Sequence, residues 1–164
     1  MPDRAIVINT TPLIALVAAG CLDALPLLYQ RVIVPMEVVD EIHAGGKKGF
    51  GAAEIAAARF LEIQTTPALI PLYLVNALDR GEAAVIATAL DQHIPLVCID
   101  ETVGRRVARL AGLTLTGSLG VLIKAKQHGY PVIVSDAIDR MRDQGIWLSQ
   151  EVATAALALA KEQD

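Results

Sequence analysis

Five short runs of apolar residues, rich in Val and Ile, have the length of buried β-strands. They cover residues 5–9, 31–35, 60–65, 95–100 and 113–117. Segments with helical spacing separate these runs, and they are long enough for the helical crossovers that parallel strands require. The alternation predicts an α/β fold with a mostly parallel sheet.

Capping residues predict where several helices begin. Thr11 followed by Pro12 fits an N-cap with proline at the first helical position. Asp79 is placed to cap the amphipathic helix that contains "GEAAVIATAL", and Ser135 and Ser149 are expected to cap two later helices.

Glycines predict helix ends and a loop, and the C-terminal region predicts a last helix. Glycines at 20, 112, 129 and 145 are expected to end helices. The glycine-rich segment 43–51, which carries Lys47 and Lys48, is expected to be a mobile loop. The last helix, after Ser149, has a face rich in Ala and Leu. We expect this face to pack on the sheet, or alternatively to form a dimer interface.

The composition suits a single domain over residues 1–164. The chain is 54% hydrophobic but only 4% aromatic, so the core must consist of Ala, Val, Ile and Leu. Small and branched aliphatic residues of this kind suit helices packed on a buried parallel sheet. A chain of 164 residues is long enough to bury a substantial core.

Charge and cysteine content indicate which partners and which cellular compartment to expect. The net charge is −4, so nucleic-acid binding would require a local basic patch. Cys21 and Cys98 lie in apolar surroundings, as expected for buried thiols in a reducing compartment. The N-terminus lacks the pattern of a signal peptide, and no apolar run is long enough to span a bilayer. We therefore expect a cytoplasmic protein without membrane contact.

Several common α/β functions lack their motifs here. No G-x-G-x-x-G follows the first strand, no phosphate-binding G-x-x-x-x-G-K-[ST] exists, and no G-x-S-x-G nucleophile elbow is present. The histidines at 43, 93 and 128 follow helical patterns near loops and are expected at the surface. Dinucleotide binding, P-loop chemistry and triad hydrolysis are therefore disfavoured.

Polar residues gather where the strands of an open α/β sheet end, the usual place for a site. Asn9 ends the first strand and Asp100 the fourth, while Glu41 and Glu82 can reach the same edge from helices. Carboxylates that converge repel one another unless a cation compensates them. Mg²⁺ or Mn²⁺ would suit such oxygen ligands and would support phosphodiester cleavage. For Glu82 alone, a favourable interaction with the helix dipole is an equal explanation.

Five segments, taken in order, resemble the PIN-domain superfamily and in particular its DUF3368 family. They are "VINTTPLIAL", "VIVPMEVVDEI", "GEAAVIATALD", "LVCIDETVGRRVARLAGL" and "TGSLGVLIKAKQHG". The resemblance implies a three-layer α/β/α Rossmann-like fold with a central parallel sheet. It also implies a Mg²⁺- or Mn²⁺-dependent ribonuclease that in many relatives is the toxin of a toxin–antitoxin pair, often as a homodimer.

The resemblance also implies site residues. The four acidic positions of the family fall on Asn9, Glu41, Glu82 and Asp100. The last three would be the metal ligands, and Thr11 or Thr10 would be the hydroxyl neighbour of the first position. Some relatives place another acid after the fifth strand, where this chain has Thr116 and Ser118.

Asn9 separates two functional hypotheses. An amide can offer a neutral oxygen to a metal but no charge, so metal binding should be weaker than with a carboxylate. The first hypothesis is a metal-dependent endoribonuclease that keeps three carboxylates. The alternative is a weakened or inactive PIN-fold protein that serves as a binding or interaction module.

Basic and hydroxyl residues near this edge predict the substrate contacts. Arg105 and Arg106 lie on the helix after Asp100, and Thr10, Thr11 and Ser118 flank the strand ends. Together they could hold the phosphate backbone of single-stranded RNA. The alternative for the arginines is a solvated helix face paired with neighbouring acids.

Overall fold

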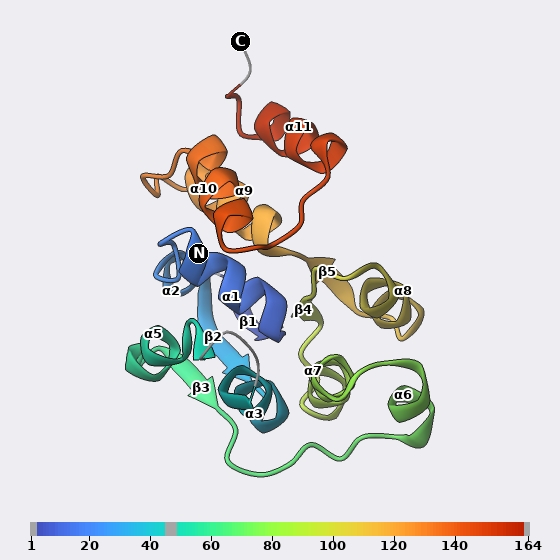
Figure 1. Cartoon of the computed structure of the whole chain (residues 1–164). Helices are drawn as coiled ribbons and strands as arrows, with labels where there is room; N and C mark the ends of the chain where they lie inside the picture. The colour runs from blue at the N-terminus through green and yellow to red at the C-terminus, as the bar shows by residue number, and fades with distance from the viewer. Residues whose placement is uncertain (1–2, 45–48, 163–164) are drawn as a thin grey trace.

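A five-stranded parallel sheet forms the centre of the protein, as seen in a computed structural model that describes residues 3–44 and 49–162 (Figure 1). The strands run in the order β3 (Leu61–Ile63), β2 (Tyr29–Val34), β1 (Asp3–Ile8), β4 (Leu96–Cys98) and β5 (Thr114–Thr116). All neighbouring strands pair in parallel. Helices flank the sheet, which confirms the predicted three-layer α/β/α fold.

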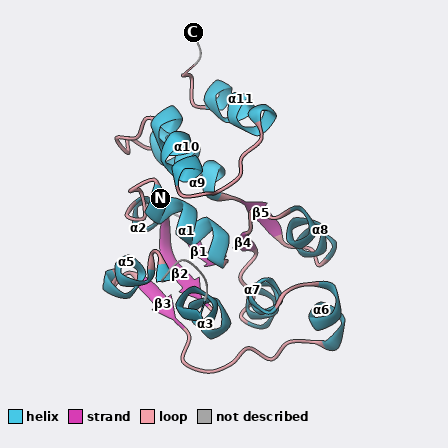
Figure 2. Cartoon of the chain, viewed as in Figure 1, coloured by secondary structure: helices cyan, strands magenta, loops and turns pink. Residues whose placement is uncertain are grey.

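Helices connect the strands and extend the chain beyond the sheet (Figure 2). They are α1 (Thr10–Ala18), α2 (Ala24–Leu28), α3 (Met36–Ala44), α5 (Ala52–Ala57), α6 (Leu72–Ala77), α7 (Arg80–Asp91), α8 (Thr102–Leu110), α9 (Ser118–Gln127), α10 (Val134–Asp143) and α11 (Gln150–Leu159). The sequence pattern did not predict α5 and α6, which have six residues each and are too short to display a clear helical period. Among the described helices, none combines the length and apolar character needed to cross a membrane.

The strand order reverses between β1 and β4. From β1 the chain builds β2 and β3 on one side, then returns to place β4 and β5 on the other. The backbone N–H of Asn9 donates to Cys98 O at 3.1 Å, which continues the β1–β4 pairing to the carboxyl ends of both strands. In open α/β sheets, ligands usually bind outside the carboxyl ends of the strands at such a reversal. Asn9 and Asp100 lie at this edge of the sheet, which we call the crevice.

The core is aliphatic, as the composition predicts. Ile6, Val7 and Ile8 of the central strand have no exposed surface, and α7 packs on β1 and β4 with an almost wholly buried first half. Burial of one such large side chain contributes about 1.5–3 kcal/mol to folding. Cys21 and Cys98 are free and buried, as predicted.

Of the four predicted helix caps, those at Asp79 and Ser149 are confirmed and those at Thr11 and Ser135 are wrong. Asp79 accepts the N–H of Glu82 at 2.8 Å, and Ser149 accepts that of Val152 at 3.1 Å. The prediction for α1 was wrong, because the helix begins at Thr10 with Asn9 in the cap position. Proline is tolerated at the third helical position as well, since its missing N–H has no intrahelical partner there.

The C-terminal helices also differ from the prediction. Helix α10 begins at Val134, so Ser135 is not its cap; the backbone N–H groups of both residues donate to the Glu162 carboxylate at 2.7 and 3.0 Å. Helix α11 packs on α9 and α10 rather than on the sheet (Figure 1). The Glu162 carboxylate therefore takes the place of a local cap for α10. Helices α9 and α10 lie between α11 and the strands.

The predictions for the helix-ending glycines and the surface histidines are confirmed. Gly20, Gly112, Gly129 and Gly145 follow helix ends with positive φ, as expected, and the three histidines are exposed. The central part of the expected 43–51 loop, with Lys47 and Lys48, lies outside the described residues.

Candidate active site

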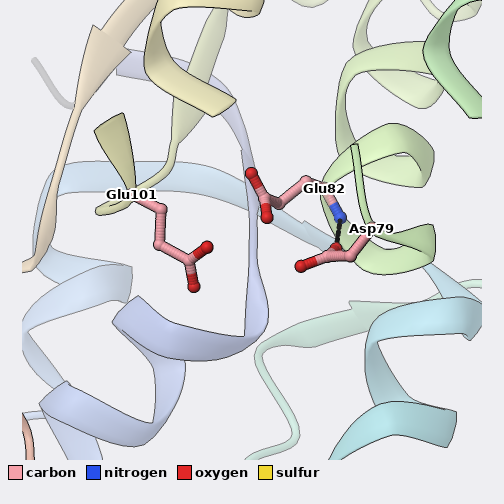
Figure 3. A group of neighbouring side chains, drawn as sticks. All are labelled: Asp79, Glu82 and Glu101. Carbon is pink, nitrogen blue, oxygen red and sulfur yellow. Dashed lines mark hydrogen bonds between the residues drawn. The ribbon is translucent and has the colours of Figure 1, made fainter. Parts of the chain in front are cut away.

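Three carboxylates converge at the crevice: those of Asp79, Glu82 and Glu101. One oxygen of each lies within 4.8 Å of the others, and the side chains point toward one another (Figure 3). Asp79 and Glu82 come from the start of α7, and Glu101 precedes α8 as its N-cap residue. Three like charges this close are costly unless protons or a cation compensate them.

Glu82 responds most strongly to this environment. It is only 4% exposed, and burial, followed by hydrogen bonding and repulsion from Asp79 and Glu101, raises its pKa to about 9. Without a cation, this environment therefore favours the uncharged form of Glu82. A raised pKa of this kind, beside specific charged partners in a crevice, is typical of functional sites.

Glu41 and Asn9 meet at the first turn of α7. Glu41 belongs to α3 and is exposed as a residue, yet desolvation and then repulsion from Asp79 raise the pKa of its carboxyl group. Asn9 is 3% exposed, and its Oδ1 has no hydrogen-bond partner among the described residues. Both side chains approach Gly81, so two of the predicted residues border the acidic group.

Asp100 lies beside this group, held by the start of α9. Its Oδ1 accepts the N–H of Ser118 at 2.7 Å, and its Oδ2 accepts the Ser118 hydroxyl at 2.8 Å. Burial nevertheless raises the pKa of Asp100 above its ordinary value, against the lowering effect of these bonds and of Arg105. Each carboxylate oxygen keeps a further lone pair, so Asp100 can still accept another partner.

The predicted substrate-contact residues have distinct environments. Arg105 Nη1 donates to Ile99 O at 2.7 Å and to Thr116 O at 3.2 Å, so this arginine ties together the ends of β4 and β5. Arg106 is exposed, and Ser118 is buried against Asp100. Thr11 donates from Oγ1 to Glu101 Oε1 at 3.2 Å, and the Thr10 hydroxyl lies close enough to lower the pKa of Glu41 in part.

Two members of the acidic group were not assigned to the site from sequence. Asp79 was predicted only as a helix cap, and Glu101, which follows Asp100 directly in the chain, was not among the candidate site residues. The sequence around each residue could have indicated a place at the site, since Asp79 precedes the "GEAAVIATAL" helix and Glu101 follows the fourth strand. Their mutual distance, however, depends on how α7 and α8 sit at the crevice.

Comparison with known proteins agrees with this architecture. The model of the DUF3368 family, described as a PIN domain, matches residues 5–162, which is nearly the whole chain. No curated protein matches the chain.

Proposed function

The chain belongs to the DUF3368 family of PIN domains, and we propose that it is a Mg²⁺- or Mn²⁺-dependent endoribonuclease. One observation carries the proposal: the carboxylates of Asp79, Glu82 and Glu101 converge within 4.8 Å at the strand-order reversal. Membership in the PIN-domain family supports a nuclease-like function. We propose in addition that the nuclease requires a divalent metal and that its substrate is RNA.

The residues at the crevice fit a hard divalent cation. They present carboxylate oxygens and the buried, unpartnered amide oxygen of Asn9, which are donors that Mg²⁺ and Mn²⁺ accept. We propose that the converging carboxylates of Asp79, Glu82 and Glu101 hold the ion, and that Glu41 and Asp100, which border this group, are further ligands. Bound there, Mg²⁺ or Mn²⁺ would activate a water molecule and stabilise charge on the phosphodiester.

The other residues of the chain would orient these groups. Ser118 holds the Asp100 carboxylate from two directions, and Thr11 holds Glu101. Because Arg105 is engaged by backbone carbonyls, we propose that it supports the strand ends, while the exposed Arg106 contacts substrate phosphates. Asn9 would orient bound water or a substrate phosphate through its Oδ1.

Cleavage of an unstructured RNA by the purified full chain tests the proposal. We expect cleavage that requires Mn²⁺, stops in EDTA and is lost in Glu82→Gln and Asp100→Asn. Glu54→Gln, an exposed acid on α5, is the matched control and should cleave like the wild type. Absence of Mn²⁺ binding by isothermal titration, or equal cleavage by Glu82→Gln, would overturn it.

A catalytically weakened binding module is the second hypothesis, favoured by the neutral Asn9 amide at the position of the family's first acid. Asn9→Asp distinguishes the two. A weakened enzyme should gain Mn²⁺ affinity and cleavage, because affinity in such sites follows ligand charge. A surface used only for binding should gain neither.

For the enzyme we further propose the biological role of a toxin that acts as a homodimer and is neutralised by an antitoxin protein. Support comes from the family resemblance. Induced expression should arrest growth, and coexpression of the product of an adjacent small gene should restore it. Growth that continues under expression of a chain shown to cleave RNA would contradict this role, and light scattering would establish the oligomeric state.

A further inference from the structure

Three carboxylates of the crevice each lie against a glycine. A Cβ atom placed on Gly81 would lie 2.3 Å from Glu41 Oε2, and one on Gly104 would lie 2.2 Å from Glu82 Oε2. A Cβ on Gly117 would lie 2.6 Å from Asp100 Oδ1. Non-bonded heavy atoms pack at about 3.5–4 Å, so any side chain at these positions would have to displace the carboxylate.

We propose that Gly81 and Gly104 are positioning residues, whose missing side chains provide the space in which the carboxylates of Glu41 and Glu82 approach the cation. This inference rests on the proposed metal site. In each pair the glycine and the carboxylate come from different elements: Gly81 of α7 meets Glu41 of α3, and Gly104 of α8 meets Glu82 of α7. Each contact therefore joins two separate parts of the fold at the crevice.

Gly81 gives the clearest case. It lies in the first turn of α7, between Asp79 and Glu82 in the chain, and Glu41 reaches it from α3. The unpartnered Oδ1 of Asn9 lies 3.4 Å from the same Cβ position. Because Glu41 is a flexible and exposed residue, a methyl group here would turn its carboxylate away from the crevice at little cost to the fold.

The other two glycines differ from Gly81 in what surrounds them. A Cβ on Gly104 would also lie 3.0 Å from Ile99 Cγ2 in the core, so Gly104→Ala should weaken both the site and the fold. At Gly117 the opposing Asp100 is fixed by two hydrogen bonds from Ser118, so Gly117→Ala should disturb the start of α9. Gly81→Ala is therefore the variant that should displace the opposing carboxylate without destabilising the fold.

The test compares Gly81→Ala with Gly120→Ala in the full chain. Gly120 is a helical glycine whose Cβ would lie 2.6 Å from Thr116 Oγ1, so it is a matched contact without a carboxylate. By isothermal titration we expect Gly81→Ala to bind Mn²⁺ roughly tenfold more weakly, as for other residues that orient ligands. Gly120→Ala should stay within about twofold of wild type. In EDTA the thermal midpoint of Gly81→Ala should not fall, because alanine favours the helix.

Shortening the opposing acid supplies a rescue. Glu41→Asp removes one methylene and makes room for the new methyl group, so the Gly81→Ala/Glu41→Asp double variant should bind Mn²⁺ more tightly than Gly81→Ala alone. Wild-type affinity in Gly81→Ala, or a double variant no better than the single one, would overturn the inference.

A metal-free readout separates this inference from the proposed function. If the wild type binds no Mn²⁺, the proposed function fails, but crystal structures of metal-free wild type and Gly81→Ala still decide the positioning role. Displacement of the Glu41 carboxylate in the variant supports the inference, and an unmoved carboxylate overturns it.

Discussion

Asp100 and Ser118 form a two-point contact: the N–H of Ser118 donates to Oδ1 at 2.7 Å, and its hydroxyl donates to Oδ2 at 2.8 Å. The contact joins the residues after β4 to the first turn of α9. It satisfies a backbone donor at the helix start and holds the Asp100 carboxylate in one orientation. Ser118, which the sequence predicts to contact substrate, is thus engaged by an acidic neighbour.

Ser118→Ala should remove one of these bonds and leave Asp100 Oδ2 without that donor. We expect the free energy of unfolding to fall by about 1–2 kcal/mol, as for a lost bond to a largely buried charged group. Urea denaturation in EDTA measures this. The exposed Thr102→Ala is the control and should change stability by less than about 0.5 kcal/mol. A Ser118→Ala variant as stable as the wild type would show that the contact contributes nothing.

Metal-free protein should lose stability as pH rises. Glu82 has its pKa raised from 4.5 to about 9 in the folded state. Between these values the folded chain holds a proton that the unfolded chain has released, so the free energy of unfolding decreases with increasing pH. Thermal unfolding in EDTA from about pH 5 to about pH 9 tests this. Glu82→Gln should flatten the dependence, and an equal slope in both proteins would contradict the assignment to Glu82.

Glu101→Gln should stabilise the metal-free protein and weaken its binding of Mn²⁺. Removal of one charge relieves repulsion between residue 101 and Asp79, so we expect metal-free unfolding to cost about 0.5–1 kcal/mol more. The same change removes negative charge from the cation site and should weaken Mn²⁺ binding roughly tenfold. Calorimetry provides both measurements, with Glu54→Gln as the exposed control. A variant that loses stability while it keeps Mn²⁺ affinity would argue against an acidic cation site.

Glu162→Ala should destabilise the C-terminal helices by about 1–2 kcal/mol at neutral pH, because α10 loses its cap. Although burial favours the neutral acid, Lys126 and the N–H groups of Val134 and Ser135 lower the pKa of Glu162 to about 2. The stabilisation is therefore complete above pH 4.5 and is lost as pH falls toward 2. Urea denaturation across this range, with the exposed Glu151→Ala as control, should show the difference only at the higher pH.

Local patterns were sufficient for most elements of the fold. The five apolar runs became the five strands, because a buried parallel strand needs only a short continuous apolar segment. The caps at Asp79 and Ser149 were predictable, since each bonds an N–H three residues ahead. The cap of α10 was not, because Glu162 lies 28 residues beyond Val134.

The candidate site shows the same division. Local context was enough to select Asn9, Glu41, Glu82 and Asp100 and to predict that they reach one edge of a sheet. It could not show that Glu101 completes a group with Asp79 and Glu82, or that Arg105 is engaged by backbone carbonyls. Those contacts join elements that are adjacent only after folding.

The sequence by itself therefore determined the α/β alternation, the places of the five strands to within two residues and the acidic character of the crevice. The tertiary structure decided which acids converge, which carboxyl group has a strongly raised pKa and which glycines leave room for the carboxylates. The physical reason is range: strand and helix preferences act over a few neighbouring residues. Repulsion, desolvation and steric space depend instead on distances between groups that the chain brings together from remote positions.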